Sequence, residues 1–316
     1  MANPEAEPIE SSDVLHSLDG IPCPECGCVN APDHSLFVSY FEAGAVTCVG
    51  CQKPFDLWAH ASEELKNWPR SWSAFHLLGA VVTRQTVALE PDRNNEVTIR
   101  AVPEGAEILR VSMNVMGPSE GPPVFPALYI PGHTLTLDPF PRRFFLYGMT
   151  HGRTTLPGST VWVHVTWIHP DEELPVHHLA DAAKQFAAGR YKGMIIPANV
   201  AVEAALTPAV TAWVRTYCSR DETDEFLGPR GATYAHQLKV LSKIAARTLD
   251  LKPLPERIRT LLNHLRQYRN DLGHRGILDR PERPEPDLAK ATEFLTAAVF
   301  GYHYARYLHS RVISPE

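Results

Sequence analysis

The chain has 316 residues, enough for two or three domains, and its 44% hydrophobic and 21% charged content is ordinary for a globular protein. Its formal net charge of −6 excludes an overall basic field, so any surface for a polyanion must be local. The 28 prolines are nearly twice the usual share of about 5%, which favours many loops and strand edges over a wholly helical body.

Residues 1–20 predict a flexible tail that lacks the basic and apolar regions of a secretory signal. No uninterrupted run of about 18 apolar residues follows, so the sequence predicts no membrane span. Five of the six cysteines lie between Cys23 and Cys51. This clustering suits a reducing compartment and a metal site better than a disulfide scaffold, and we expect a cytoplasmic protein.

Residues 21–56 predict a zinc ribbon. Two Cys-x2-Cys pairs, with 21 residues between them, are formed by Cys23, Cys26, Cys48 and Cys51. This spacing is typical of zinc sites, and four thiolates leave no open position, so the ion is expected to be structural. Redox disulfides are the alternative. Cys28 is surplus, and His34 is a weaker rival ligand.

Three aromatic residues follow the first cysteine pair: Phe37, Tyr40 and Phe41. They could stack nucleobases, but burial in a core is the favoured interpretation.

Residues 57–78 mix three tryptophans with charged residues and predict a short helical connector. Residues 79–170 predict an antiparallel β-sandwich of six to eight strands, with a barrel as the alternative. Apolar and polar residues alternate there along several runs, which turn signals rich in Gly and Pro separate. The clearest runs are Val97–Val102, Leu109–Val115 and Val161–Trp167.

Residues 171–316 predict a helical domain. Five helices are expected, at Glu172–Gly189, Met194–Cys218, Tyr234–Leu249, Glu256–Gly273 and Asp287–His309. A polar loop is expected over Ser219–Arg230. Helices that are neighbours in sequence and joined by short loops should pack as an antiparallel bundle.

The fourth of these helices ends in the run RNDLGH, from Arg269 to His274. Its apolar residues recur at helical spacing and form one stripe toward the bundle. Asn270 and His274 are four residues apart and share a face, and the long Arg269 side chain can reach round to it. The run therefore places a permanent cation and a titratable imidazole within reach of one phosphate.

The local charge differs from that of the whole chain. Between Gly231 and Gly276, nine Lys and Arg stand against three Asp and Glu, a local charge of +6. A solvated helix face is the ordinary interpretation, and a polyanion site is the alternative. The candidate RNA contacts are Lys243, Arg247, Arg266 and Arg275.

The run from Arg269 to His274 resembles the arginine-to-histidine motif of HEPN domains, small helical bundles found in many RNases and toxins. A polar residue often follows the arginine in that family, and Asn270 is similar. The resemblance covers about residues 171–312, in which Pro197–Leu206 also resembles the small-residue helix of such domains. It implies a metal-independent endoribonuclease that acts as a homodimer through its helical domain, with Arg269, Asn270 and His274 as catalytic residues.

In the implied mechanism an imidazole takes the proton of a ribose 2′-OH, and a guanidinium binds the phosphoryl oxygens. The resemblance also favours a toxin or phage-defence role, with the other domains or a protein regulator as a restraint. Two alternatives stay open. One is a non-catalytic HEPN dimerisation or binding module whose ribbon recognises a partner or nucleic acid, and the other is a nucleotide-binding regulator.

Overall fold

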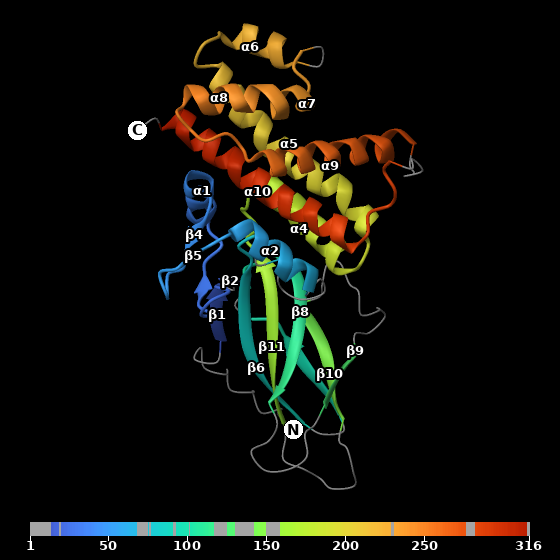
Figure 1. Cartoon of the computed structure of the whole chain (residues 1–316). Helices are drawn as coiled ribbons and strands as arrows, with labels where there is room; N and C mark the ends of the chain where they lie inside the picture. The colour runs from blue at the N-terminus through green and yellow to red at the C-terminus, as the bar shows by residue number, and fades with distance from the viewer. Residues whose placement is uncertain are drawn as a thin grey trace. The chain divides into compact units, whose positions relative to one another are not determined.

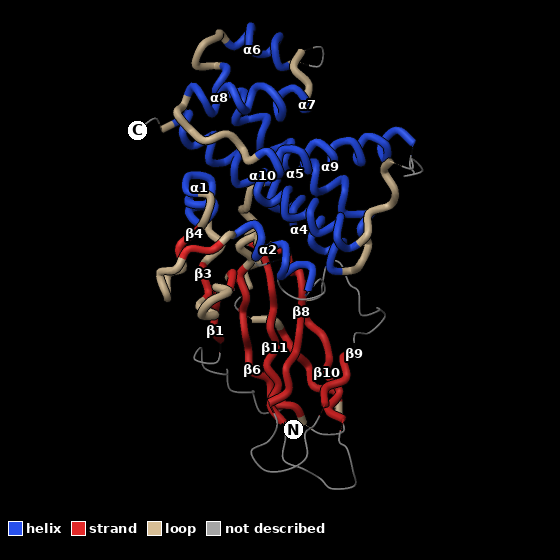
Figure 2. The backbone as a smooth tube through the Cα atoms, viewed as in Figure 1, coloured by secondary structure: helices blue, strands red, loops and turns tan. Residues whose placement is uncertain are grey.

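The computed structural model describes residues 14–18, 20–67, 75, 77–90, 93–100, 102–116, 125–129, 142–149, 159–228, 231–275 and 282–314. The chain divides into two compact units (Figure 1). We call Met1–Asp19 with Ala80–Asp171 the β unit, and Gly20–Gly79 with Glu172–Glu316 the helical unit. The cysteine module and the connector, expected as separate segments, therefore belong to the same unit as the C-terminal helices. Figure 2 shows strands throughout the first unit and mainly helices in the second.

The β unit contains two antiparallel sheets. A four-stranded sheet has the order β1-β6-β11-β8, and a three-stranded sheet has the order β7-β10-β9. Their bounds are β1 (Val14–Leu18), β6 (Val81–Leu89), β7 (Asn94–Thr98), β8 (Glu107–Met116), β9 (Phe125–Tyr129), β10 (Arg143–Met149) and β11 (Ser159–Ile168). Six of these described strands, β6 to β11, lie in the segment 79–170 for which six to eight were expected, and the mixed helix-and-sheet composition is confirmed.

Strand β1 lies inside the segment expected to be a flexible tail. Its five residues pair with β6, from Val14 opposite Gln85 to Leu18 opposite Val81. The run VLHSL is too short to read as a strand on its own, and its pairing with an edge of the four-stranded sheet supplies the backbone hydrogen bonds that it needs.

One core lies between the two sheets. Val161, Val163 and Val165 of β11 are fully buried, and they share a cluster with Phe144 and Leu146 of β10. Alternation along β11 sends every second residue to this core, as its sequence predicts. The finer assignment to a β-sandwich stays a prediction that this shared core supports.

Helix α10 is the centre of the helical unit. It contacts α4, α5 and α9, and nearly all its residues between Ala291 and Leu308 are buried. Gly301 allows the close approach of the neighbouring helices, because a Cβ there would lie 2.8 Å from Leu262 of α9 and 3.1 Å from Val202 of α5. The bounds are α4 (Leu174–Ala187), α5 (Tyr191–Val214), α9 (Glu256–Arg275) and α10 (Leu288–Ile313).

The expected polar loop over Ser219–Arg230 is wrong for most of its length, since Arg220–Leu227 forms helix α6. A capping box starts this helix: the Glu222 carboxylate accepts from the Ser219 N–H at 2.8 Å, and the Ser219 hydroxyl accepts from the Glu222 N–H at 3.4 Å. The third expected helix is broken into α7 (Tyr234–His236), a π-helical turn η2 (Gln237–Leu241) and α8 (Ser242–Thr248).

Two further helices join the cysteine module to α10. They are α1 (His34–Ala43) and α2 (Leu57–Asn67). The ring of Phe300 lies 5.1 Å, centroid to centroid, from Phe37 of α1 and 5.1 Å from Trp58 of α2. Phe37 and Phe41 are buried, so the core interpretation is confirmed for these two, whereas Tyr40 is half-buried. The Tyr307 hydroxyl also donates to the Glu42 carboxylate at 2.8 Å.

Helix α5 is long and apolar enough to cross a membrane by length and composition alone, the one such helix in the described part of the chain. Its most apolar window has a mean hydropathy of 1.4, and half of that window is buried inside the structure. The core helix of a helical bundle has the same composition, and α5 packs against both α4 and α10.

Replacing Phe300 by Ala should lower the free energy of unfolding of the helical unit by about 3–5 kcal/mol, because the fully buried ring leaves a cavity among four aromatic neighbours. Urea unfolding followed by far-UV circular dichroism measures the change. Ile313→Ala at the exposed end of the same helix is the control and should change it by no more than about 0.5 kcal/mol. Equal effects of the two substitutions would contradict the conclusion that the packing of Phe300 stabilises the helical unit.

Candidate functional site

Two short hairpins hold the four clustered cysteines. The first is β2 (Ile21–Pro22) with β3 (Val29–Asn30), and the second is β4 (Val46–Thr47) with β5 (Pro54–Phe55). Helix α1 is inserted between them, which explains the 21 residues that separate the two cysteine pairs.

Both hairpin turns have the same backbone geometry. In each turn, the N–H of the first cysteine donates to the carbonyl of the residue five positions later. The N–H of the residue four positions later donates to the carbonyl of that same cysteine. This fourth position is left-handed in both turns, with φ 71° at Gly27 and φ 60° at Gln52. Glycine adopts this conformation without strain. The Gln52 side chain instead donates to the Val49 carbonyl at 3.1 Å, which stabilises its turn.

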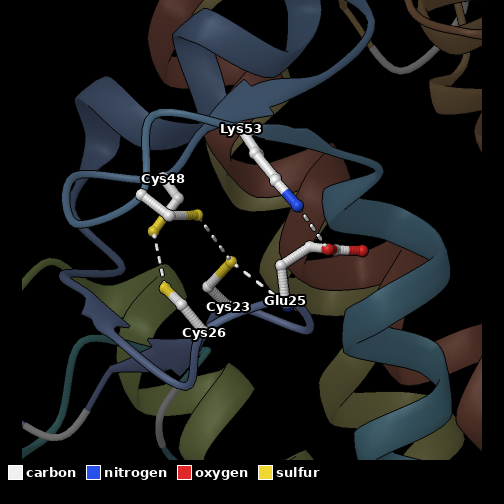
Figure 3. Close-up of polar contacts among 6 residues, drawn as sticks. Cys23, Glu25, Cys26, Cys48 and Lys53 are labelled. Atoms are coloured by element: carbon white, nitrogen blue, oxygen red, sulfur yellow. Dashed lines mark hydrogen bonds and ion pairs between the residues drawn. The ribbon is translucent and has the colours of Figure 1, made fainter.

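The two turns bring the four sulfur atoms together, all within 4.8 Å of one another. The Sγ atoms of Cys23 and Cys51 are 3.8 Å apart, and those of Cys26 and Cys48 are 3.7 Å apart. Zinc–sulfur bonds of about 2.3 Å in a tetrahedron place the sulfur atoms about 3.8 Å apart. The cluster could therefore bind a metal ion, and its geometry is compatible with structural zinc. Figure 3 shows the sulfur atoms of Cys23, Cys26 and Cys48 pointing toward one another.

Backbone N–H groups point at cysteine sulfur atoms of the cluster. The Gly50 N–H points at the Cys48 sulfur at 3.3 Å, and the Glu25 N–H points at the Cys23 sulfur at 3.4 Å. The N–H groups of Cys51 and Gly50 lower the pKa of Cys48 to about 6. The Lys53 N–H lowers the pKa of Cys51, but burial and the neighbouring sulfur atoms outweigh it and raise that pKa to about 11. The thiolate form is therefore favoured at Cys48, where a metal ion meets less competition from protons.

Asn30 links the two hairpins, and the sequence analysis did not identify it. It is almost fully buried, and its amide donates to the carbonyls of Ile21 at 3.2 Å and Cys28 at 3.1 Å. Its side-chain oxygen accepts from the Val49 N–H of the other hairpin at 3.0 Å. An asparagine at the end of a strand has no distinctive spacing, so only the fold reveals this role.

The surplus Cys28 and the rival ligand His34 are not among the four clustered cysteines. Cys28 packs against Gly50, where an added Cβ would lie 2.8 Å from its sulfur, and burial is the main cause that raises the pKa of its thiol. His34 lies at the start of α1, with its Nδ1 3.4 Å from the Nδ1 of the buried His303 on α10. His34 therefore contributes to the packing of α1 on α10 rather than to the cysteine cluster.

The second candidate site is the last two turns of α9, which contain the whole run from Arg269 to His274. The helix ends two residues later than expected, at Arg275. Arg269 and Asn270 are half-buried, and the Arg269 Nη1 donates to the Asn270 side-chain oxygen at 3.3 Å. His274 is exposed, and no hydrogen bond or ion pair with another described residue engages its ring. The structure thus brings Arg269 and Asn270 together and leaves the imidazole accessible.

Asp271, inside the same run, is used locally. Its carboxylate pairs with the Arg283 Nε at 2.6 Å, and both side chains are largely buried. Arg283 also donates to the Gln267 side chain at 3.2 Å. This pair holds Arg283 against the last turns of α9.

The four candidate RNA contacts differ in their surroundings. Arg247 is exposed on α8, and the Lys243 ammonium lies 3.9 Å from the Glu256 carboxylate. Arg266 is half-buried, with its Nε away from solvent. The backbone of Arg275 belongs to α9, but its side chain lies outside the described residues.

Arg266 belongs to a polar seam that the sequence analysis did not identify. We define the seam as Asn199 and Glu203 of α5, Tyr234 of α7, and Arg266. The Asn199 amide lies 3.4 Å from the Glu203 carboxylate. The Tyr234 hydroxyl, the Asn199 side-chain oxygen and the Arg266 Nε are buried without a hydrogen-bond partner. Burial, and then the charge of Glu203, raise the pKa of Tyr234.

The chain was compared with family models, with curated proteins and with solved structures, and no significant match was found in any of the three comparisons. The functional argument therefore depends on the residues and their geometry.

Replacing Cys48 by Ser should abolish metal binding, because the remaining three thiolates no longer close the tetrahedron. Native mass spectrometry of the purified full-length chain measures the metal content, with a single ion per chain expected for the wild type. Cys28→Ser is the matched control in the same module and should retain the ion. Loss of the ion from both variants, or from neither, would contradict the ligand assignment.

Replacing Tyr234 by Phe should leave the free energy of unfolding unchanged within about 0.5 kcal/mol or raise it, because the lost hydroxyl has no hydrogen-bond partner. Tyr304→Phe is the matched control, since the Tyr304 hydroxyl donates to the Lys252 carbonyl at 3.1 Å, and it should lose about 1 kcal/mol. Chemical denaturation compares the two. A larger loss for Tyr234→Phe would mean that its hydroxyl has a stabilising partner.

Proposed function

We propose that the chain is a metal-independent endoribonuclease with a HEPN-type helical domain and Arg269, Asn270 and His274 as its catalytic residues. One observation carries the proposal: the last two turns of α9 contain the exposed imidazole of His274 together with a half-buried guanidinium and an amide that are hydrogen-bonded to each other. A pre-ordered cation beside an available base is what phosphodiester cleavage without a metal ion requires.

In the proposed reaction, His274 takes the proton of a ribose 2′-OH. The 2′-oxygen forms a bond to the adjacent phosphorus, and the bond from phosphorus to the 5′-oxygen breaks. The leaving oxygen takes a proton, so the products are a 2′,3′-cyclic phosphate and a 5′-OH. Arg269 stabilises the charge that develops on the phosphoryl oxygens, and the hydrogen bond from Arg269 to Asn270 orients the guanidinium.

The reaction needs both a base and an acid, and the described run offers one imidazole per chain. A homodimer formed through the helical domain supplies the second from the partner copy, in one composite site. Arg247 and Lys243 on α8 are candidate contacts for the flanking phosphates. The half-buried Arg266 supports the helix face that carries Asn270, which lies one turn further along α9.

The cysteine cluster is proposed to hold structural zinc. Four thiolates close the coordination sphere and leave no position for a substrate, so the ion contributes to folding and not to the chemical step. The proposal includes a cytoplasmic location, which suits reduced thiolates. It also includes a toxin or phage-defence role, in which the other parts of the chain or a protein regulator restrain the nuclease.

A non-catalytic module for dimerisation or binding is the second candidate. The observation that favours it is that two polar side chains of the run already have local partners: Arg269 donates to Asn270, and Asp271 pairs with Arg283. In that case the run only terminates α9.

Replacing His274 by Ala should slow the cleavage of single-stranded RNA by about 10²–10⁴-fold, because the general base is lost. Cleavage is measured with purified full-length protein in buffer that chelates free divalent ions, with the zinc content checked and the product ends analysed. His264→Ala, an exposed histidine on the same helix, is the matched control and should cleave at the wild-type rate. Equal rates for wild type and His274→Ala would reject the nuclease and favour the binding module.

A further inference from the structure

A further candidate ligand surface lies on the β unit. It is the face of the four-stranded sheet that is turned away from the core of that unit. Val161, Val163 and Val165 of β11 are buried toward the three-stranded sheet. Alternation therefore places Trp162 and His164 on the opposite face, where both are partly exposed. The core cluster shared with the three-stranded sheet contains neither residue, so that sheet covers only the inner face.

Neighbouring strands add cations to this outer face. Arg84 of β6 is opposite His164, and its guanidinium carbon lies 4.5 Å from the centroid of the Trp162 ring. On the other side of β11, Arg110 of β8 is opposite Thr166. Strands β6, β11 and β8 are neighbours in the sheet, as Figure 1 shows. We call Arg84, Arg110, Trp162 and His164 the outer-face patch.

The charge of the outer-face patch is opposite to that of the chain. Around the patch the registers place Thr86 and Ser112 on the same face. Thr166 on this face is buried, and Glu107, three residues before Arg110 and next to the core residue Ile108, adds one carboxylate to it. The formal net charge of the chain is −6. Burial lowers the pKa of Arg110, so its guanidinium is partly desolvated.

A guanidinium stacked on an indole can simply be a packing contact. Two further features favour a ligand. The pair lies over the two inner strands of the sheet. The imidazole of His164 flanks it, edge-on to Trp162 at 6.4 Å between ring centroids. The patch also combines flat rings and planar cations with a second arginine across the sheet. Single-stranded nucleic acids are bound by this combination, with bases stacked on aromatic or guanidinium planes and phosphates paired with arginine.

We propose that the outer-face patch binds single-stranded RNA. The choice of RNA rests on the proposed endoribonuclease function, and the patch gives the β unit the role of holding the substrate strand. An acidic protein segment would satisfy the charge of the patch but not its stacking surface, so it is the competing ligand that the test must exclude.

The experiment measures the binding of a fluorescently labelled single-stranded RNA oligonucleotide to the full-length chain by anisotropy. The His274→Ala background prevents cleavage during the measurement. Trp162→Ala should weaken binding by about 5–150-fold, which is the loss of one stacked base. Arg84→Ala should weaken it and reduce the salt dependence by about one phosphate contact. Arg143→Ala removes the same charge from an exposed site on the other sheet and should bind as the background does.

Two further variants keep the test informative if Trp162→Ala fails to fold. Trp162→Phe should keep most of the affinity, because a smaller ring still stacks, and Arg84→Lys should lose the guanidinium plane but keep the charge. Folded Trp162→Phe and Arg84→Ala proteins that both bind like the background would overturn the proposal. Equal affinity for a double-stranded RNA, or displacement of the RNA by a poly-glutamate peptide with the same dependence on Trp162, would overturn it in favour of simple charge attraction.

The outcome is separable from the nuclease proposal. A dinucleotide substrate is too short to need a second binding surface, so its cleavage should be unchanged by Trp162→Ala and lost in His274→Ala. Trp162-dependent RNA binding without any cleavage by the wild type would reject the nuclease and retain the RNA surface. Cleavage that depends on His274, together with RNA binding that does not change in the Trp162 and Arg84 variants, would retain the nuclease and reject the RNA surface.

Discussion

The aromatic packing around Phe300 is the interaction on which the helical unit depends. Rings from α1 and α2 meet this residue near the middle of α10, the most buried helix of the unit. Without it the cysteine hairpins would be two short turns with almost no apolar surface of their own, too small to fold independently. The metal cluster and the helices therefore form one folding unit, although the sequence separates them by the whole β unit.

Much of this arrangement follows from local patterns. Four helices of the C-terminal region and the inward face of β11 were predicted because apolar residues recur at the helical or strand period. The cysteine ligands were predicted because their spacing is set by the geometry of two identical turns. The prediction of a loop was wrong at α6, because this helix has a polar sequence without an apolar stripe. A capping box stabilises its first turn with hydrogen bonds instead.

The features that the sequence did not predict depend on contacts between distant segments, which no local pattern contains. Asn30 joins two hairpins, and the polar seam joins three helices. The aromatics of α1 gave no sign of which surface would bury them, since that surface is more than 250 residues away at Phe300. The arginine-to-histidine run was visible, but whether its groups engage each other or the surrounding protein depends on side-chain packing, as the separate partners of Arg269 and Asp271 illustrate.

The metal cluster also has a physical route to the helix that carries the run. Trp58 of α2 packs on Phe300, and the guanidinium of Arg257, near the start of α9, lies 5.2 Å from the Trp58 ring centroid. Because metal binding is coupled to folding, the free energy of binding an ion to four thiolates would stabilise the folded hairpins. It would thereby also stabilise the packing of α1 and α2 on α10. Loss of the ion would expose the Phe300 cluster and free the start of α9, whereas the stripe Ile258, Leu262 and Leu265 would still hold the middle of that helix. A metal ion held by the four cysteines would thus act on the proposed site at the end of α9 through the stability of that helix.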